Sequence, residues 1–376
     1  MKYLLLLALV LASPARADVT LGAVLSLTGP GAGLGVPARN TIELLPKTMA
    51  GEPVRWVVLD DGSDSTAAVR AVRKLVEEER VDAILGPSTS PASVAVLDAA
   101  AGTPFLSLAG SNAPIEPQEG ARRWAFKLFP GERLATGQMA AHMKRTGAGP
   151  LAMIGFSTAL GDGYLAAMRA DAAAQGIPIV AEARYAPGDS SVSPQVLRLL
   201  QAKPGAVFVA ASAAPAAAPI IELRARGFAG PIYTVTGIAG PDAIRVGGRA
   251  LDGVLLSGVP VLVAESLDDA NPVKRAALAF VGAYEAKYGA GSRNLFGATL
   301  WDSFLVLDRA AGPALTAARP GTPEFRSALR DAMERVQGLA GAEGVFSLSP
   351  ADHSGAEPGS QVMIEIRGGG YRLVPP

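Results

Sequence analysis

The feature that most constrains the fold is a repeated alternation of short apolar runs with longer helical patterns. The apolar runs do not alternate with polar residues, so each predicted strand is expected to be covered on both faces. Helical patterns between consecutive strands supply such cover in parallel sheets. The chain is therefore predicted to be an α/β protein with parallel sheets.

The alternation occurs in two series, separated by the Pro130-Gly131 pair. Strands of the first series are predicted at 19–27, 54–59, 83–85 and 105–108. Strands of the second series are predicted at 151–156, 177–185, 206–210, 232–235 and 254–259. Helical patterns follow, and the pattern around the three glycines near the C-terminus predicts a β-hairpin at 361–374. Each series is long enough for a sheet of its own, which predicts two domains.

Residues 1–17 are predicted to be a secretory signal peptide. Lys2 gives a positive start, an apolar stretch follows, and Ala15-Arg16-Ala17 has the small-x-small pattern of a cleavage site. An apolar stretch of about ten residues spans only about 15 Å as a helix, half of a bilayer core. The mature chain is therefore expected to begin at Asp18, without a membrane anchor, in a bacterial periplasm.

Composition excludes several classes of protein. The chain has no cysteine, which excludes disulfides, thiolate metal sites and a lipid-modified N-terminal cysteine. Its 34 basic and 34 acidic residues balance, so no basic surface for nucleic acid is expected. Two histidines are too few for a multi-histidine metal centre, and His142 is expected at the surface of a helix. With no visible pair of nucleophile and base, the chain is not expected to be an enzyme, and no metal or cofactor is expected.

The glycines from Gly29 to Gly35 follow the first predicted strand, where a dinucleotide fingerprint would lie. Their spacing is G-x-G-x-G-x-G and not G-x-G-x-x-G, so we expect a glycine-rich turn instead. In open α/β sheets, ligands bind beyond the carboxyl ends of the strands. In the first series the loops at those ends are rich in serine, threonine and glycine.

A family resemblance is carried by stretches at 25–30 (LSLTGP), 58–61 (VLDD), 81–93, 104–107 and 346–355, the last with the sequence DHSG at 352–355. In this order, behind a signal peptide, they resemble the periplasmic substrate-binding proteins of ABC importers, of the leucine/isoleucine/valine-binding type.

The resemblance implies the type I periplasmic binding fold: two Rossmann-like lobes with parallel sheets, a hinge of three crossover strands and a ligand cleft between the lobes. The first lobe would comprise residues 18–130 and 260–358, and the second 131–259 and 359–376. The hinge would close over a small-molecule ligand, and the closed protein would dock as a monomer on an ABC permease that works with an ATPase.

The resemblance also implies binding residues in the first lobe. Ser90, beside Thr89, matches the serine whose hydroxyl and N–H hold the carboxylate of the ligand. Ser111, with Gly110 before it, matches a second hydroxyl position and its backbone. Two plainer interpretations stay open: Ser90 can cap the helix that begins at Pro91, and Ser111 can be an ordinary turn serine.

The second lobe departs from the family pattern. Amino-acid binders of this type carry an acid there that pairs with the ligand ammonium, but the matching stretch holds Thr236 and Gly237. Smaller side chains also stand where the family has tryptophan or tyrosine, namely Leu34, Leu160, Ala213 and Ala214. A buried ammonium without a carboxylate costs several kcal/mol. The departures therefore favour a hydrophobic or aromatic carboxylate without an amine, while family usage favours an amino acid.

Other residues could complete the site. Trp301 and Phe296 lie on a late helical pattern that borders the cleft in the family, although both could equally pack in the core. Asp61 and Asp302 are possible polar partners for an ammonium. The predicted function is the periplasmic solute-binding component of an ABC importer. The alternative is a periplasmic sensor that presents its ligand to a membrane receptor.

Overall fold

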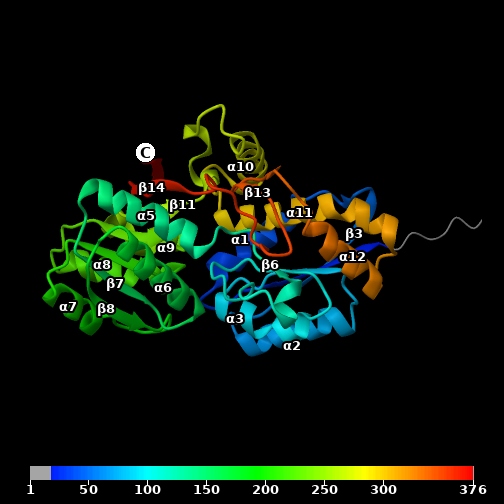
Figure 1. Ribbon diagram of the computed structural model, residues 1–376, viewed down its shortest axis with the longest axis horizontal. Helices are drawn as coiled ribbons and strands as arrows, with labels where there is room; N and C mark the ends of the chain where they lie inside the picture. Colours follow the sequence, from blue (N-terminus) through cyan, green and yellow to red (C-terminus); the bar gives the residue numbers. More distant parts are fainter. Residues whose placement is uncertain (1–17, 376) are drawn as a thin grey trace, which may run out of the picture.

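The computed structural model describes residues 18–375, which form two α/β lobes lying side by side (Figure 1). The predicted signal peptide lies outside the described residues. Within residues 18–375, no helix combines the length and the apolar character needed to cross a bilayer. The two predicted sheets are confirmed, one in each lobe.

The sheet of the first lobe has six strands, which are β1 (Val19–Leu25), β2 (Thr48–Met49), β3 (Glu52–Asp60), β4 (Ala83–Leu85), β5 (Phe105–Leu106) and β6 (Ala125–Phe126). Their order is β2-β3-β1-β4-β5-β6, and β1 runs parallel to both β3 and β4. Among the described strands of this sheet, only the two-residue β2 is antiparallel to its neighbour.

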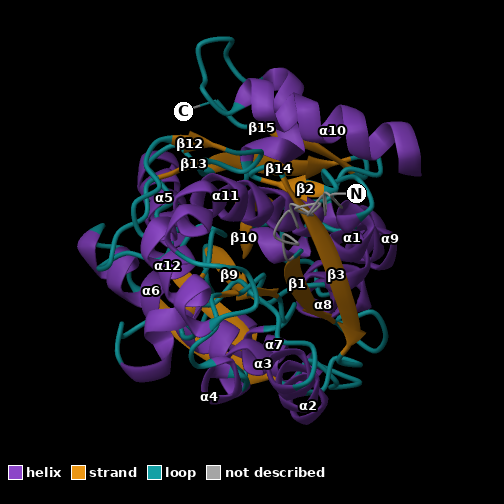
Figure 2. Ribbon diagram, turned by 90° about the vertical axis from the view of Figure 1, so that its right-hand side faces the viewer, coloured by secondary structure: helices purple, strands orange, loops and turns teal. Residues whose placement is uncertain are grey.

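Helices cover both faces of this sheet, as the apolar runs predict. Val19, Leu21, Ala23 and Leu25 of β1 share one buried cluster with residues of α1 (Ala32–Ile42), α11 (Leu295–Ala317) and α12 (Pro323–Met333). Val24 faces the other way, toward α2 (Ser65–Glu77), α3 (Ser90–Ala95) and α4 (Leu97–Ala100). Figure 2 shows α2, α3 and α4 on the opposite side of β1 from α11.

The sheet of the second lobe has seven strands, which are β7 (Leu151–Phe156), β8 (Ile179–Tyr185), β9 (Ala206–Ala210), β10 (Ile232–Val235), β11 (Leu255–Gly258), β14 (Val362–Arg367) and β15 (Gly370–Leu373). Their order is β15-β14-β11-β10-β9-β7-β8. The strands from β7 to β11 are parallel, and the predicted C-terminal hairpin joins β11 in antiparallel register.

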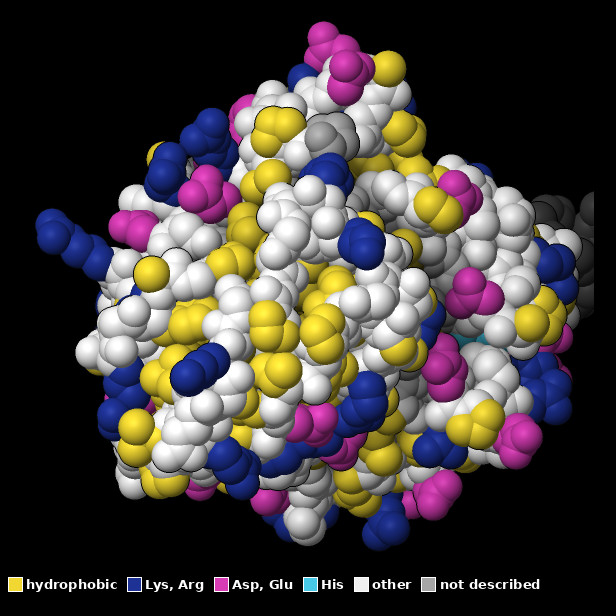
Figure 3. Space-filling model, turned by 60° about the vertical axis from the view of Figure 1, so that its left-hand side comes forward, with side chains coloured by type: hydrophobic (Ala, Val, Ile, Leu, Met, Phe, Trp, Pro, Cys, Tyr) yellow, Lys and Arg dark blue, Asp and Glu magenta, His cyan; other side chains and the backbone are white. Residues whose placement is uncertain are grey.

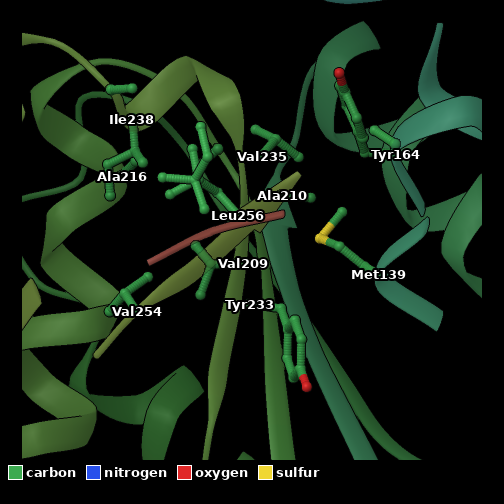
Figure 4. Close-up of a cluster of buried hydrophobic side chains, with 14 of the residues drawn as sticks. Met139, Tyr164, Val209, Ala210, Ala216, Tyr233, Val235, Ile238, Val254 and Leu256 are labelled. Carbon is green, nitrogen blue, oxygen red and sulfur yellow. The ribbon is translucent and has the colours of Figure 1, made fainter. Parts of the chain in front are cut away.

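Helices surround this second sheet too, namely α5 (Glu132–Thr146), α6 (Ala159–Ala174), α7 (Ser193–Gln201), α8 (Ala217–Ala225) and α9 (Pro241–Gly247). Figure 4 shows part of the core beneath them, where Val235 lies on the same side of the sheet as Met139 of α5 and Tyr164 of α6, and Val209 lies on the opposite side with Ala216. On the face in Figure 3, basic and acidic side chains are interspersed among apolar ones.

The chain passes between the lobes three times. It crosses at 127–131 between β6 and α5, after β11 toward α10 (Lys274–Tyr288) and α11, and between β13 (Val345–Phe346) and β14. The predicted lobe boundaries fall within these segments and stay predictions.

Two local predictions are wrong. The chain from Gly29 to Gly35 is not only a turn, because α1 begins at Ala32; a Cβ on Gly35 would lie 2.2 Å from the carbonyl oxygen of Ser26, so glycine lets the helix pack directly on the first strand. His142 is not on the surface. It is 8% exposed, and its Nδ1 lies 2.9 Å from the hydroxyl of Tyr233, which gives the ring a polar partner inside the lobe.

Candidate ligand-binding site

A cavity of about 200 Å³ lies between the two lobes. The loops that follow β3, β4 and β5 contribute to it from the first lobe, and the loops that follow β7, β9 and β10 contribute from the second. These loops all lie at the carboxyl ends of parallel strands, where ligands bind in open α/β sheets. A cavity of about 150 Å³ accommodates benzene, so this volume suits a single ring with a short substituent.

Apolar side chains from both lobes form most of the wall. The first lobe supplies Leu34 of α1 and Leu108 after β5, and Phe296 of α11 closes one side. The second lobe supplies further apolar side chains, which are Phe156, Leu160, Tyr164, Pro187, Pro215 and Val235. Such a wall favours a ligand with a hydrophobic body.

Hydroxyl groups provide the polar part of the lining. Ser90 Oγ accepts a hydrogen bond from the backbone N–H of Ser111 at 3.3 Å, and Ser88 Oγ accepts one from Ser26 at 3.2 Å. Neither hydroxyl donates its own hydrogen to an acceptor within residues 18–375. Both therefore remain free to donate to an acceptor group on a ligand.

Charged side chains do not line this cavity within the described residues. One carboxylate borders a smaller adjoining hollow, which shares Leu34, Ala213 and Phe296 with the main cavity. This carboxylate belongs to Asp242, which is exposed and lies 3.1 Å from the guanidinium of Arg245. The described residues also contain no cluster of side chains suited to hold a metal ion.

Most of the residues implicated from the sequence lie around the cavity. Those that line it are Leu34, Thr89, Ser90, Gly110, Leu160, Ala213, Gly237 and Phe296. Ala214 borders the smaller hollow. Thr89 is the N-cap residue of α3, and Ser90 is the first helical residue, so the capping position predicted for Ser90 is wrong by one residue.

Three others do not line the cavity. Ser111 is buried behind Ser90 and donates its hydroxyl to the carbonyl of Ala159 at 3.2 Å. Thr236 donates its hydroxyl to the carbonyl of Ser257 on β11. Trp301 packs edge to face on Phe280, with ring centroids 5.7 Å apart.

The two acids considered for an ammonium also lie outside the lining. Asp302 is buried and accepts hydrogen bonds from the N–H groups of Ala342 and Glu343. Asp61 accepts a hydrogen bond from the hydroxyl of Ser26 at 2.8 Å, and burial raises its pKa. Neither carboxylate reaches the cavity.

Sequence reasoning missed several wall residues. Phe156 and Val235 are the last residues of β7 and β10, so the rule that sites form at carboxyl ends of strands could have identified them. Phe129 lies in the first crossing segment. Tyr164 gave a weaker signal: it lies four residues after Leu160, on the same face of α6.

Comparisons with known proteins agree with this geometry. A family profile described as "Periplasmic binding protein" matches residues 18–369. An extracellular ligand-binding receptor from Rhodopseudomonas palustris HaA2 is 38% identical, with a TM-score of 0.91, over 96% of this chain and 100% of that chain. No curated protein matches the sequence.

Two more distant structures share the fold. The leucine-binding protein LivK from Thermotoga maritima is 22% identical, with a TM-score of 0.80, over 95% of this chain and 98% of that chain. A solute-binding protein of an ABC transporter from R. palustris, solved in complex with benzoate, is 21% identical, with a TM-score of 0.79, over 95% of this chain and 96% of that chain.

Proposed function

This chain belongs to the periplasmic binding protein family, and we propose that it captures a hydrophobic or aromatic carboxylate without an amine for an ABC importer. One observation carries the choice of ligand: the cavity between the lobes offers hydroxyl donors and apolar walls but, among residues 18–375, no acidic side chain. The protein would act in the periplasm after removal of its signal peptide and deliver the ligand to a membrane permease.

The electrostatic argument concerns the ammonium of an α-amino acid. An ammonium carries three donors and no acceptor, so inside the cavity it needs acceptors and preferably a carboxylate. Within the described residues, the hydroxyl hydrogens of Ser88 and Ser90 have no acceptor, and no carboxylate lines the cavity to balance the charge of an ammonium. A carboxylate satisfies such donors, and charge-assisted hydrogen bonds of this kind are about twice as strong as neutral ones.

The position of the cavity explains how capture and release would occur. Apolar wall residues come from both lobes, so the ligand contacts both only when the lobes are close together. Closure about the three crossing segments would therefore be favoured by the ligand. The benzoate complex of the distant solute-binding protein supports the proposal, since the same fold holds an aromatic carboxylate there.

A thermal-shift panel on residues 18–376 tests the ligand class. The panel compares leucine with 4-methylpentanoate, phenylalanine with 3-phenylpropanoate, and includes benzoate. A ligand at 100 times its dissociation constant adds about 2.7 kcal/mol of stability, which corresponds to a melting-temperature rise of a few degrees. We expect the amine-free acids to give this rise and the amino acids to give none.

The opposite outcome identifies a different site. If only the α-amino acids raise the melting temperature, the proposed ligand class is wrong. Asp242 would then be the acid to test, because its carboxylate borders the adjoining hollow.

A further inference from the structure

Tyr164 of α6 is a buried polar side chain on the cavity wall, and its hydroxyl has no hydrogen-bond partner within the described residues. The residue is only 1% exposed. Buried tyrosine hydroxyls usually find a partner. Two other buried tyrosines of the same lobe do so: Tyr185 donates to the carbonyl of Pro215 at 3.2 Å, and the Tyr233 hydroxyl lies 2.9 Å from His142 Nδ1.

The hydroxyl of Tyr164 is directed out of the lobe core. In Figure 4 it points away from the other labelled side chains. A Cβ built on Gly110 would lie 4.0 Å from the Tyr164 oxygen, and Gly110 belongs to the first-lobe lining of the cavity. The hydroxyl therefore reaches the side of the cavity that the first lobe forms.

Ser90 flanks the same corner of the cavity. The residue after Gly110 is Ser111, whose backbone N–H donates to Ser90 Oγ. Ser90 and Tyr164 thus approach the segment 110–111 from different lobes, and each has a hydroxyl hydrogen without an acceptor in the part of the chain that the structure describes.

The Tyr164 hydroxyl is a donor at neutral pH. Burial, together with the nearby carboxylate of Glu132, raises the pKa of Tyr164 far above its usual value. One carboxylate oxygen of Glu132, Oε1, accepts a hydrogen bond from the backbone N–H of Asn112 at 2.7 Å.

We propose that Tyr164 is a specificity-determining residue, whose hydroxyl donates to the same acid group that Ser90 holds. This inference rests on the proposed function. An acid bound in this way accepts one hydrogen bond from each lobe, so closure itself would select for an acceptor on the ligand. A ligand that presents an ammonium at this corner would leave both hydroxyl hydrogens without an acceptor, which is the costly outcome in a desolvated site.

Tyr164→Phe tests the inference, and Tyr233→Phe is the matched control, since it removes a buried tyrosine hydroxyl that has a protein partner. The probes are benzoate and 3-phenylpropanoate, titrated by calorimetry into the wild type and both variants. The melting temperature of each ligand-free protein is measured in parallel.

We expect Tyr164→Phe to weaken binding of the acids by about tenfold or more, as for a hydrogen bond to a charged group. Its ligand-free melting temperature should stay the same or rise, because no hydrogen bond of the free protein is lost. Tyr233→Phe should lower the melting temperature and change the dissociation constants less than about threefold.

Three outcomes would overturn the inference in different ways. Unchanged affinity of Tyr164→Phe, with the wild type binding the acids, would overturn the role of Tyr164 and leave the proposed function intact. If ligand-free Tyr164→Phe melts at a lower temperature than the wild type, and this loss of stability accounts for its weaker binding, Tyr164 has a structural role instead. A wild type that binds neither acid would overturn the proposed function, and this inference with it.

Discussion

At the scale of single residues, Gly110 of the first lobe shows how closely the two lobes approach each other at the cavity. A Cβ on this residue would lie 3.3 Å from Cδ1 of Leu160, tight enough that Leu160 would have to move by a few tenths of an ångström. The added methyl would also occupy space inside a cavity of only about 200 Å³. We expect Gly110→Ala to weaken ligand binding by about tenfold while the ligand-free melting temperature stays nearly unchanged.

Calorimetric titration and thermal denaturation measure these two quantities. Gly282→Ala is the matched control, since Gly282 lies on an exposed part of α10 with no atom within 4 Å of the added Cβ. Equal affinities of Gly110→Ala and the wild type would show that the ligand does not occupy this part of the cavity.

A residue of the candidate site could be identified from the sequence when its position near a strand end was enough to place it. It could not be identified when the direction of its side chain depends on a distant segment. Thr89 lies in the short segment between β4 and α3, and Ser90 begins α3, so their place near a strand end is visible along the chain. Thr236 follows a strand directly, but its hydroxyl turns to the carbonyl of Ser257 on β11. That choice depends on a neighbouring strand about twenty residues away, and no local pattern reveals it.

At the scale of elements, the parallel strands were predicted best. The bounds of β4, β7, β9 and β10 agree with their predictions, because a strand covered on both faces is an uninterrupted apolar run between turn residues. Helix ends are harder to place from sequence. Helix α11 continues through Pro313 to Ala317, and α2 is capped by Asp64, whose carboxylate accepts the N–H of Ala67.

Helix α11 also buries an acidic pair with the segment before β13. Burial raises the pKa of Asp302 to about 7, and burial together with the Asp302 charge raises the pKa of Glu343. An acid whose pKa is higher in the folded state than in the unfolded chain stabilises the fold below about pH 4 and loses this contribution as pH rises toward 7. The loss should amount to a few kcal/mol.

We therefore expect Asp302→Asn to lose less stability than the wild type between pH 4.5 and pH 7.5, as measured by urea denaturation. Lys127 is buried, and its charge lowers the pKa of Glu343. Burial lowers the pKa of Lys127 itself to about 8, so Lys127 stays charged over most of this range. An identical dependence on pH in the two proteins would contradict the assignment to Asp302.

At the scale of the whole molecule, two hydrogen bonds link the lobes beside the cavity. Glu132 at the start of α5 accepts the N–H of Asn112 at 2.7 Å, and the Ser111 hydroxyl donates to the carbonyl of Ala159 at 3.2 Å. Segment 111–112 follows β5 in the first lobe, whereas α5 and α6 belong to the second. Such contacts exist only while the lobes are close together, so they should favour the closed arrangement with or without a ligand.

Removing the charged contact should therefore shift the population toward an open arrangement. A hydrogen bond to a charged group contributes about 1.5–3 kcal/mol, so Glu132→Ala should weaken ligand binding by about tenfold or more, mainly through faster dissociation. Stopped-flow dissociation rates measure this effect, and small-angle scattering should show a larger radius of gyration for the ligand-free variant. Arg133→Ala is the control, because Arg133 pairs with Asp171 at 2.8 Å within the second lobe. If both variants release ligand at the same rate, the contact between Glu132 and Asn112 does not control closure, and the hinge segments alone set the balance between open and closed forms.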